Sequence, residues 1–404
     1  MWSRLDLGVG LIAAGGVDLL WPDIADVVDV VEVEPQTLWD HTRGDGRRLE
    51  RRALGWLRSL DRPLLSHGVG FPVGGTFPPD PDGVRAAARS ARELDAVHWS
   101  EHLSFNRTGA EGEHAGYLLP PIPTPDSVSA AVGHIRTYQQ QLDRPFLVET
   151  PTSYLRPLPG DLPDGEYVAR IAEEADCGIL LDLHNIWSNE LNGRQAVADF
   201  VDAIPLERVW EVHFAGGFDF EGYHLDAHVG PVAEPLLQLA RDVVPRLPNV
   251  RALLFEAVPE SVVALGAPGL RTVLQQLRGV AQLPVAPSAP KRGGAATAAA
   301  SPGSSLTADR EAALLAFTTR HSDVLPDGDR GAQVLRLLTD EARLSLLAVH
   351  RADVLGRLLR RHGSARTEAL LQAFLAESSA SSWPRDQAEA FDVWLARREP
   401  GITG

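Results

Sequence analysis

The stretch between Val209 and Val229 has the residue types and spacing of a metal site. It reads VWEVHFAGGFDFEGYHLDAHV, in which an apolar run ends at His213 and a glycine-rich turn leads to Asp226 and His228. Side chains two positions apart in an extended segment point to the same side, so Asp226 and His228 are expected to converge. Imidazole and carboxylate groups suit iron, manganese or zinc. The stretch therefore predicts part of a site for such an ion.

Other metal-capable side chains follow short apolar runs elsewhere in the chain, within the segments SHGVG, WSEHLSF, VETPTSY, LLDLHN, EVHFAGG and LLFEAVPE. From these segments we single out His67, Glu101, His102, Glu149, Asp182, His184, His213 and Glu256. A single catalytic zinc needs three protein ligands and one open position, so a set this large indicates at least two ions. The set contains no cysteine, which favours a hard or borderline ion, and a carboxylate such as Glu149 can bridge two ions.

Two kinds of chemistry fit such a site. Zinc or manganese would activate water for hydrolysis or support isomerisation. Iron with open coordination positions would activate O2. A module that binds metal or peptide without catalysis is the non-enzymatic alternative.

The elements that must position these residues alternate regularly from residue 5 to about residue 279. Eight short apolar runs are predicted as strands: 5–9, 28–33, 63–66, 96–99, 146–148, 178–181, 209–212 and 252–255. Amphipathic stretches between them are predicted as helices: 83–94, 126–142, 166–175, 195–204 and 232–247. This alternation predicts an α/β fold, a (β/α)8 TIM-type barrel over residues 1–280, in which the strand ends meet at one mouth. A doubly wound open sheet is the alternative, but it gives no reason for the polar strand ends.

The C-terminal part has a different composition. Residues 281–308 are rich in Pro, Ala, Gly and Ser without periodicity, which predicts a flexible linker. Residues 309–404 have apolar positions spaced by three and four, which predicts a small all-helical domain. We expect few contacts to cross the linker.

Charge and composition narrow the setting. A formal net charge of −16 argues against a general nucleic-acid binder. The first residues, MWSRLDLGVGLIAAGG, include an acid at position 6 and no long apolar run, so we expect neither a signal peptide nor a membrane span. Cys177 is the sole cysteine, which excludes an internal disulfide and favours a reducing, cytoplasmic setting.

The ordered segments SHGVGF, SEHLSF, VETPTSYL, GILLDLHNI, EVHFAGG, DAHVGPV and LLFEAVPE resemble those of the multinuclear non-heme iron-dependent oxidases. That family includes the oxidase of methanobactin biosynthesis. The resemblance covers residues 1 to about 279 and implies a TIM-type barrel with two to three Fe ions, in mixed Fe(II)/Fe(III) states, and O2 as co-substrate. The implied substrate is a ribosomally synthesised precursor peptide, oxidised at residues that are often cysteines. The implied ligands are His67, His102, Glu149, Asp182, His213, Asp226, His228 and Glu256.

The chain departs from the family pattern at several positions. Glu101 replaces the usual Asp, Thr150 the usual Asn, and His184-Asn185 the usual Asn-Asn. We predict that His184 is a further metal ligand. The carboxylate often found just after the last Glu is absent, since Ala257 and Val258 follow Glu256. The resemblance assigns no catalytic residue beyond the metal ligands.

The resemblance also implies a partner for the substrate. Family members generally need a separate partner protein that holds the leader segment of the precursor. A fused helical domain can supply that function in cis at high effective concentration. The alternative is a packing or oligomerisation domain.

At the end of the second predicted strand, Glu32 and Glu34 are expected to be hydrogen-bond partners of the ligands.

Overall fold

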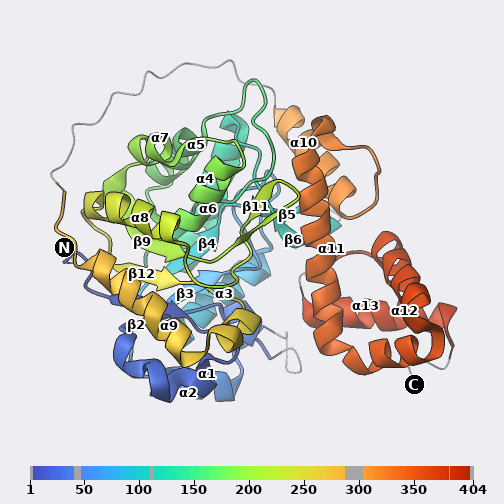
Figure 1. Cartoon of the computed structure of the whole chain (residues 1–404). Coiled ribbons are helices and arrows are strands. Elements are labelled where there is room, and N and C mark those ends of the chain that lie inside the picture. Colours follow the sequence, from blue (N-terminus) through green and yellow to red (C-terminus); the bar gives the residue numbers. More distant parts are fainter. Residues whose placement is uncertain (1–2, 41–46, 110–112, 287–303, 382, 401–404) are drawn as a thin grey trace.

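A closed barrel of parallel strands forms the larger part of the protein (Figure 1). The computed structural model describes residues 3–40, 47–109, 113–286, 304–381 and 383–400. Within them the strands follow each other around the barrel in the order β1-β12-β9-β8-β7-β4-β3-β2. Their bounds are Gly8–Ile12 (β1), Val30–Val33 (β2), Leu64–Gly68 (β3), Trp99–His102 (β4), Phe146–Glu149 (β7), Gly178–Asp182 (β8), Val209–Phe214 (β9) and Ala252–Phe255 (β12). The closed order confirms the predicted (β/α)8 barrel and excludes the open sheet.

The barrel strands are buried on both faces, which is why they read as nearly continuous apolar runs. Every residue of β8, from Gly178 to Asp182, is buried. The first strand begins three residues later than predicted, at Gly8 instead of residue 5. Leu5 has a left-handed φ of 54°, which breaks the extended backbone at the start of the apolar run.

Helices cover the outside of the barrel (Figure 1). They are α1 (Val17–Ile24), α2 (Arg51–Ser59), α3 (Pro81–Leu94), α4 (Pro125–Gln141), α5 (Asp164–Glu174), α6 (Leu183–Leu191), α7 (Val197–Ala203), α8 (Glu234–Val243) and α9 (Pro259–Ala281). The predicted helices correspond to α3, α4, α5, α7 and α8. The start of α4 shows how local sequence fixes a boundary, because Thr124 and Ser127 form a reciprocal capping box.

Two antiparallel hairpins were not predicted. Strands β5 (Phe105–Thr108) and β6 (Glu113–Leu119) extend the loop after β4. Strands β10 (Phe218–Phe220) and β11 (Tyr223–Leu225) extend the loop after β9 and end directly before Asp226. Both hairpins therefore rise from the mouth of the barrel, where they shape the site.

The C-terminal region is helical, as predicted. It contains α10 (Ser304–Thr318), α11 (Arg330–His350), α12 (Ala352–Glu377) and α13 (Pro384–Arg398). Helix α10 begins at Ser304, so the predicted linker end at residue 308 is wrong. Residues 287–303 of that linker lie outside the described residues. In Figure 1, α11 runs beside the barrel, and α12 and α13 form a lobe next to it.

The expectation that few contacts cross the linker is wrong. Phe105 and Leu119 of the first hairpin share one buried cluster with Leu315 of α10 and Leu335 of α11. The carboxylate of Glu311 accepts hydrogen bonds from the backbone N–H and hydroxyl of Thr76. Helices α10 and α11 thus pack on the barrel hairpin.

The lobe of α12 and α13 has a core of its own, which includes Leu358, Phe374, Phe391 and Leu395. None of the helices in the described residues is long and apolar enough to cross a membrane.

Candidate metal centre

Three strand ends bring a first group of ligand-type side chains together. His102 is the last residue of β4 and Glu149 the last residue of β7, and His67 is the next-to-last residue of β3. Their potential ligand atoms all lie within 4.8 Å of one another. Oε2 of Glu149 is 3.4 Å from Nε2 of His67 and 3.2 Å from Nε2 of His102.

The same glutamate belongs to a second group. Potential ligand atoms of Glu149, Asp182, His213 and Glu256 also lie within 4.8 Å of one another, and all four side chains are buried. Nδ1 of His213 is 3.3 Å from Oε1 of Glu256 and 3.9 Å from Oε1 of Glu149. Because Glu149 takes part in both groups, it has the position that a carboxylate bridging two ions requires.

A third group lies at the outer edge of the second. Oδ1 of Asp226 is 3.0 Å from Nδ1 of His184 and 3.0 Å from Nε2 of His228. Nε2 of His228 is in turn 3.6 Å from Oε2 of Glu256, which connects this group to the second. The structure therefore brings all nine predicted ligand residues to one end of the barrel.

The extended backbone expected at Asp226 and His228 is not observed, and Asp182 and His184, which are also two positions apart, do not belong to one extended segment either. Asp182 and His184 do not lie on one side of an extended strand, because α6 begins at Leu183 and Asp182 caps it by accepting a hydrogen bond from the N–H of Asn185. His228 lies in a loop and has a left-handed φ of 53°. The side chains converge through a helix start and a loop turn, and the hairpin β10–β11 carries Asp226 to the mouth.

In two of the imidazoles, those of His67 and His102, the ring nitrogen that does not face Glu149 forms a hydrogen bond within the protein. Nδ1 of His102 lies 2.8 Å from the carbonyl oxygen of Gly68. A carbonyl only accepts hydrogen bonds, so Nδ1 carries a proton, and Nε2, which faces Glu149, is the nitrogen available to a metal ion. Nδ1 of His67 is hydrogen-bonded to Oγ of Ser100 at 2.8 Å. Such outer hydrogen bonds typically orient metal-binding histidines.

The residues present fit a cation. Several deeply buried atoms of the first two groups have no hydrogen-bond partner in the part of the chain that is described, namely His67 Nε2, Glu149 Oε2, Asp182 Oδ2 and His213 Nδ1. Buried polar atoms are normally paired, so four orphans at one place call for a partner that only a bound group supplies. Imidazole and carboxylate donors suit iron, manganese or zinc.

Burial and neighbouring charges shift the pKa values of the side chains at the mouth. Burial raises the pKa of Glu149 to about 8, although the nearby His102 imidazole opposes this shift. For His102, burial lowers the pKa, but the carboxylates of Glu149 and Glu101 outweigh it and raise the pKa to about 10. Against the effect of burial, His213 and His228 hold the pKa of Glu256 well below its usual range. Protons thus occupy positions at which a metal ion would place its charge.

Two further buried acids, Glu101 and Glu211, form hydrogen bonds with protein side chains outside the nine residues. Glu101, which the sequence placed at a strand end, accepts a hydrogen bond from the hydroxyl of Tyr138 at 2.9 Å. Glu211 was not singled out, although it lies two positions before His213 in β9 and therefore points to the same side. Its Oε2 is 2.7 Å from Nε2 of His98. The alternation along β9 could have revealed Glu211.

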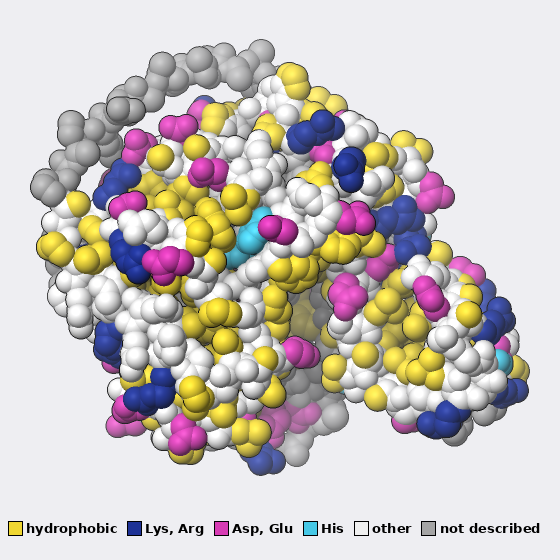
Figure 2. Space-filling view, viewed as in Figure 1, with side chains coloured by type: hydrophobic (Ala, Val, Ile, Leu, Met, Phe, Trp, Pro, Cys, Tyr) yellow, Lys and Arg dark blue, Asp and Glu magenta, His cyan; other side chains and the backbone are white. Residues whose placement is uncertain are grey.

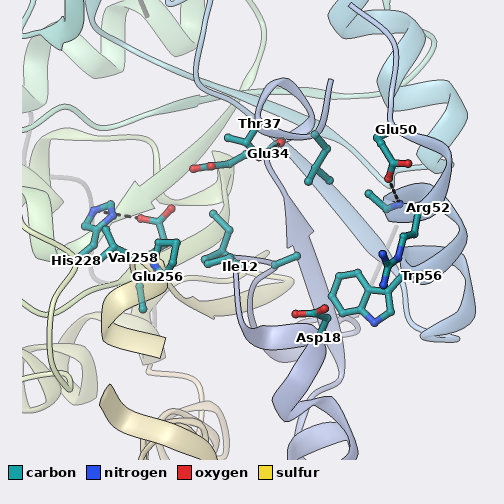
Figure 3. A pocket seen from close by; sticks show the side chains of 17 residues that line it. Ile12, Asp18, Glu34, Thr37, Glu50, Arg52, Trp56, His228, Glu256 and Val258 are labelled. Atoms are coloured by element: carbon teal, nitrogen blue, oxygen red, sulfur yellow. Dashed lines mark hydrogen bonds and ion pairs between the residues drawn. The ribbon is translucent and has the colours of Figure 1, made fainter. Parts of the chain in front are cut away.

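Two cavities reach the centre from different sides. The first, of about 600 Å³, extends from Glu256 and His228 to Trp56 and Arg52 of α2 (Figure 3). The second, of about 610 Å³, is lined by His102, Glu149 and Asp226, by the hairpin β5–β6, and by the α11 residues Leu335, Ala342 and Leu346. Glu34, His228 and Val258 line both cavities. Figure 2 shows histidine and acidic side chains at the surface amid hydrophobic ones.

Comparisons with known proteins identify several relatives of this chain. A UPF0276 protein of Pseudomonas aeruginosa is 35% identical over 215 residues, which cover 52% of this chain and 72% of that protein. One from Shewanella loihica is 30% identical over 241 residues, which cover 59% and 82%. The crystal structure of a xylose isomerase domain containing protein from Salmonella typhimurium matches with a TM-score of 0.48 at 14% identity, over 70% of this chain and 100% of that one.

More than half of the chain also matches a described family. Residues 7–260, which hold the barrel strands and all nine residues gathered at the mouth, match the RiPP precursor modification enzyme family MbnB/TglH/ChrH. The chain therefore belongs to the MbnB/TglH/ChrH family of RiPP precursor modification enzymes.

Proposed function

We propose that this protein is a multinuclear iron- and O2-dependent oxidase that modifies residues, cysteine above all, of a ribosomally synthesised precursor peptide. The observation that carries the proposal is the shared carboxylate of Glu149, which lies within ligand distance of two groups of buried imidazoles and carboxylates. A cluster of this kind is built for more than one ion. The family match supplies the precursor peptide as the substrate class.

The three groups would hold two to three ions. His67, His102 and Glu149 would hold the first, and Glu149 would share the second with Asp182, His213 and Glu256. The remaining residues, His184, Asp226 and His228, would bind a third ion or complete the second. Bound iron would supply the activation of O2 and the transfer of electrons from the substrate.

The chain itself would position the peptide. The second cavity combines a polar floor, at Glu149 and Asp226, with an apolar wall from α11 at Leu335 and Leu346. A cavity of this composition suits a peptide side chain whose reacting atom must reach the floor while water is excluded. Because α11 forms one wall, the helical region would act on the substrate at the centre itself as well as through any leader segment that it recruits.

The activity test uses a cysteine-containing precursor peptide, chosen from the short open reading frames found near the gene, incubated with iron-loaded protein in air and without O2. The proposal predicts a mass change in the peptide that requires both iron and O2. Peptide modification by zinc-loaded protein without O2 would instead support a hydrolase or isomerase. A metal-loaded protein that binds the peptide unchanged would support the non-catalytic alternative.

The cavity wall has a test of its own. Ala342→Trp on α11 fills part of the second cavity and replaces none of the nine residues, so the variant should keep its metal and lose at least about tenfold in kcat/KM. Leu337→Trp is the matched control, because Leu337 is 48% exposed on the same helix. Equal kcat/KM in both variants would contradict a role of α11 in substrate binding.

A further inference from the structure

A second polar cluster is buried inside the barrel, next to the candidate centre. It consists of Glu32 in β2, Glu211 in β9 and His98, which directly precedes β4. All three side chains are fully buried. Oε2 of Glu211 is 2.7 Å from Nε2 of His98. Neither of the two cavities described above is lined by any of them.

His213 lies between this cluster and the candidate centre. Its Nδ1 faces the second group, 3.3 Å from Oε1 of Glu256. Its Nε2 faces the buried acids, 3.0 Å from Oε2 of Glu32 and 3.5 Å from Oε1 of Glu211. Opposite edges of one ring therefore contact two separate sets of carboxylates.

The two edges demand different protonation. A neutral imidazole has one N–H and one lone pair, and a metal ion takes the lone pair. Carboxylates that approach the other nitrogen are acceptors, so the proton belongs on that nitrogen. Within the described chain neither oxygen of Glu32 makes a hydrogen bond, and His213 is the imidazole that approaches it. Glu32 thus lacks a hydrogen-bond donor, which a protonated Nε2 of His213 can supply, and that Nε2 lacks an acceptor, which Glu32 can supply.

We propose that Glu32 and Glu211 are positioning residues, which hold His213 with a protonated Nε2 toward themselves and the lone pair of Nδ1 toward the metal centre. His98 anchors Glu211 by its hydrogen bond to Oε2. This role rests on the proposed metal site but requires neither iron nor oxidase activity. It goes beyond the nine ligand residues because it explains which nitrogen of His213 is available to an ion.

A direct rival is a metal ion within the cluster. Atoms of Glu32, Glu211 and His213 also lie within 4.8 Å of one another. The positioning role is favoured because His98 already occupies one oxygen of Glu211, and because the two cavities that reach the mouth do not reach the cluster. The two readings place the ion on different nitrogens of His213, which an experiment can distinguish.

The direct test is the tautomer of His213 in wild-type protein loaded with zinc, a diamagnetic probe. With ¹⁵N-labelled histidine, long-range ¹H–¹⁵N spectra assign the coordinated and the protonated nitrogen, and His213→Gln identifies the signal. The proposal predicts a metal-bound Nδ1 and a protonated Nε2. A metal-bound Nε2 would overturn it and make Glu32 and Glu211 ligands.

Metal affinity provides a second readout. Glu32→Gln keeps the volume but removes the negative charge, so the affinity for anaerobic Fe(II) at one site should fall about 10- to 100-fold. Glu211→Gln, the second variant, should weaken the same site. The control is Glu311→Gln. It also removes the charge of a fully buried carboxylate, but that carboxylate accepts a hydrogen bond from Thr76 and does not belong to the cluster around His213. Circular dichroism of the metal-free variants checks the fold, and unchanged Fe(II) affinity in folded variants would overturn the proposal.

The test separates this role from the oxidase. Wild-type protein that holds zinc at Nδ1 of His213 but oxidises no peptide would support the positioning role and contradict the proposed function. Wild-type protein that binds neither zinc nor Fe(II) would overturn both.

Discussion

The mouth of the barrel and the helical region both bury charged side chains, but they partner them differently. In the helical region, Arg343 is fully buried and its two terminal nitrogens donate hydrogen bonds to the carbonyl oxygens of Leu375 and Ser378, while its Nε has no partner among the described residues. Arg320 forms an ion pair with Asp340. At the mouth, atoms of Glu149 and other buried residues lack hydrogen-bond partners in the described chain.

In the helical region, protein groups pair most of the polar atoms of the buried arginine, whereas at the mouth several neighbouring atoms have no partner among the described residues. An unsatisfied buried polar group costs about 1–3 kcal/mol, so a group of them is retained only where something else requires it. Backbone carbonyls pair both terminal nitrogens of Arg343, which ties α11 to the end of α12 at Leu375 and to Ser378 directly after it. A bound cation would supply the partners that these atoms of the mouth lack.

The largest effect should follow from the residue that both groups share. Glu149→Ala removes a ligand from two sites at once, so bound metal should fall by about two ions per chain. Plasma emission spectroscopy on dialysed protein measures this loss. Glu260→Ala, at the exposed start of α9, is the control. Full metal content in Glu149→Ala would show that metal binding at the mouth does not depend on the shared carboxylate.

A smaller loss should follow from His184→Ala. His184 contacts Asp226 in the third group, so the variant should lose about one ion per chain and keep its fold. His224→Ala is the matched control, because the ring of His224 lies beside that of His184 but its Nδ1 is bonded to Asp219. Equal metal content in both variants would show that His184 only orients Asp226.

The helical region should respond in stability and not in metal. Arg343→Met leaves the carbonyls of Leu375 and Ser378 without their donor, which should cost about 2–4 kcal/mol. Chemical denaturation measures that cost. Metal content should be unchanged, because Arg343 lies in α11 and lines neither cavity. Loss of metal in a folded Arg343→Met protein would contradict the separation of the two regions.

The smallest effect concerns pH. Burial, reinforced by the charge of Glu256, raises the pKa of Glu34 to about 7. An acid with a raised pKa in the folded state makes the fold less stable as pH rises from about 4.5 to 7. In metal-free protein, Glu34→Gln should therefore raise Tm by roughly 2–5 °C at pH 8 and leave it unchanged at pH 4.5. A Tm difference that does not depend on pH would contradict this account.

Much of the fold and site could be predicted because both follow local patterns. Runs such as GILLD, ending in Asp182, mark a buried strand and its polar end in one segment. What could not be predicted depends on contacts between distant segments. Nothing near Phe105 or Leu119 in the sequence reveals that Leu315 and Leu335 complete their core. For the same reason, the sequence did not show that α11 forms a wall of the cavity at the centre.

Metal analysis is the strongest test of whether the barrel mouth holds a multinuclear iron centre, as we propose. Protein from iron-supplemented cells, purified without O2, should contain two to three Fe per chain and show a visible spectrum that changes on exposure to O2. Glu149→Ala protein prepared in parallel should lack that spectrum. Stoichiometric zinc in the wild-type protein, with peptide modification that proceeds without O2, would contradict the account.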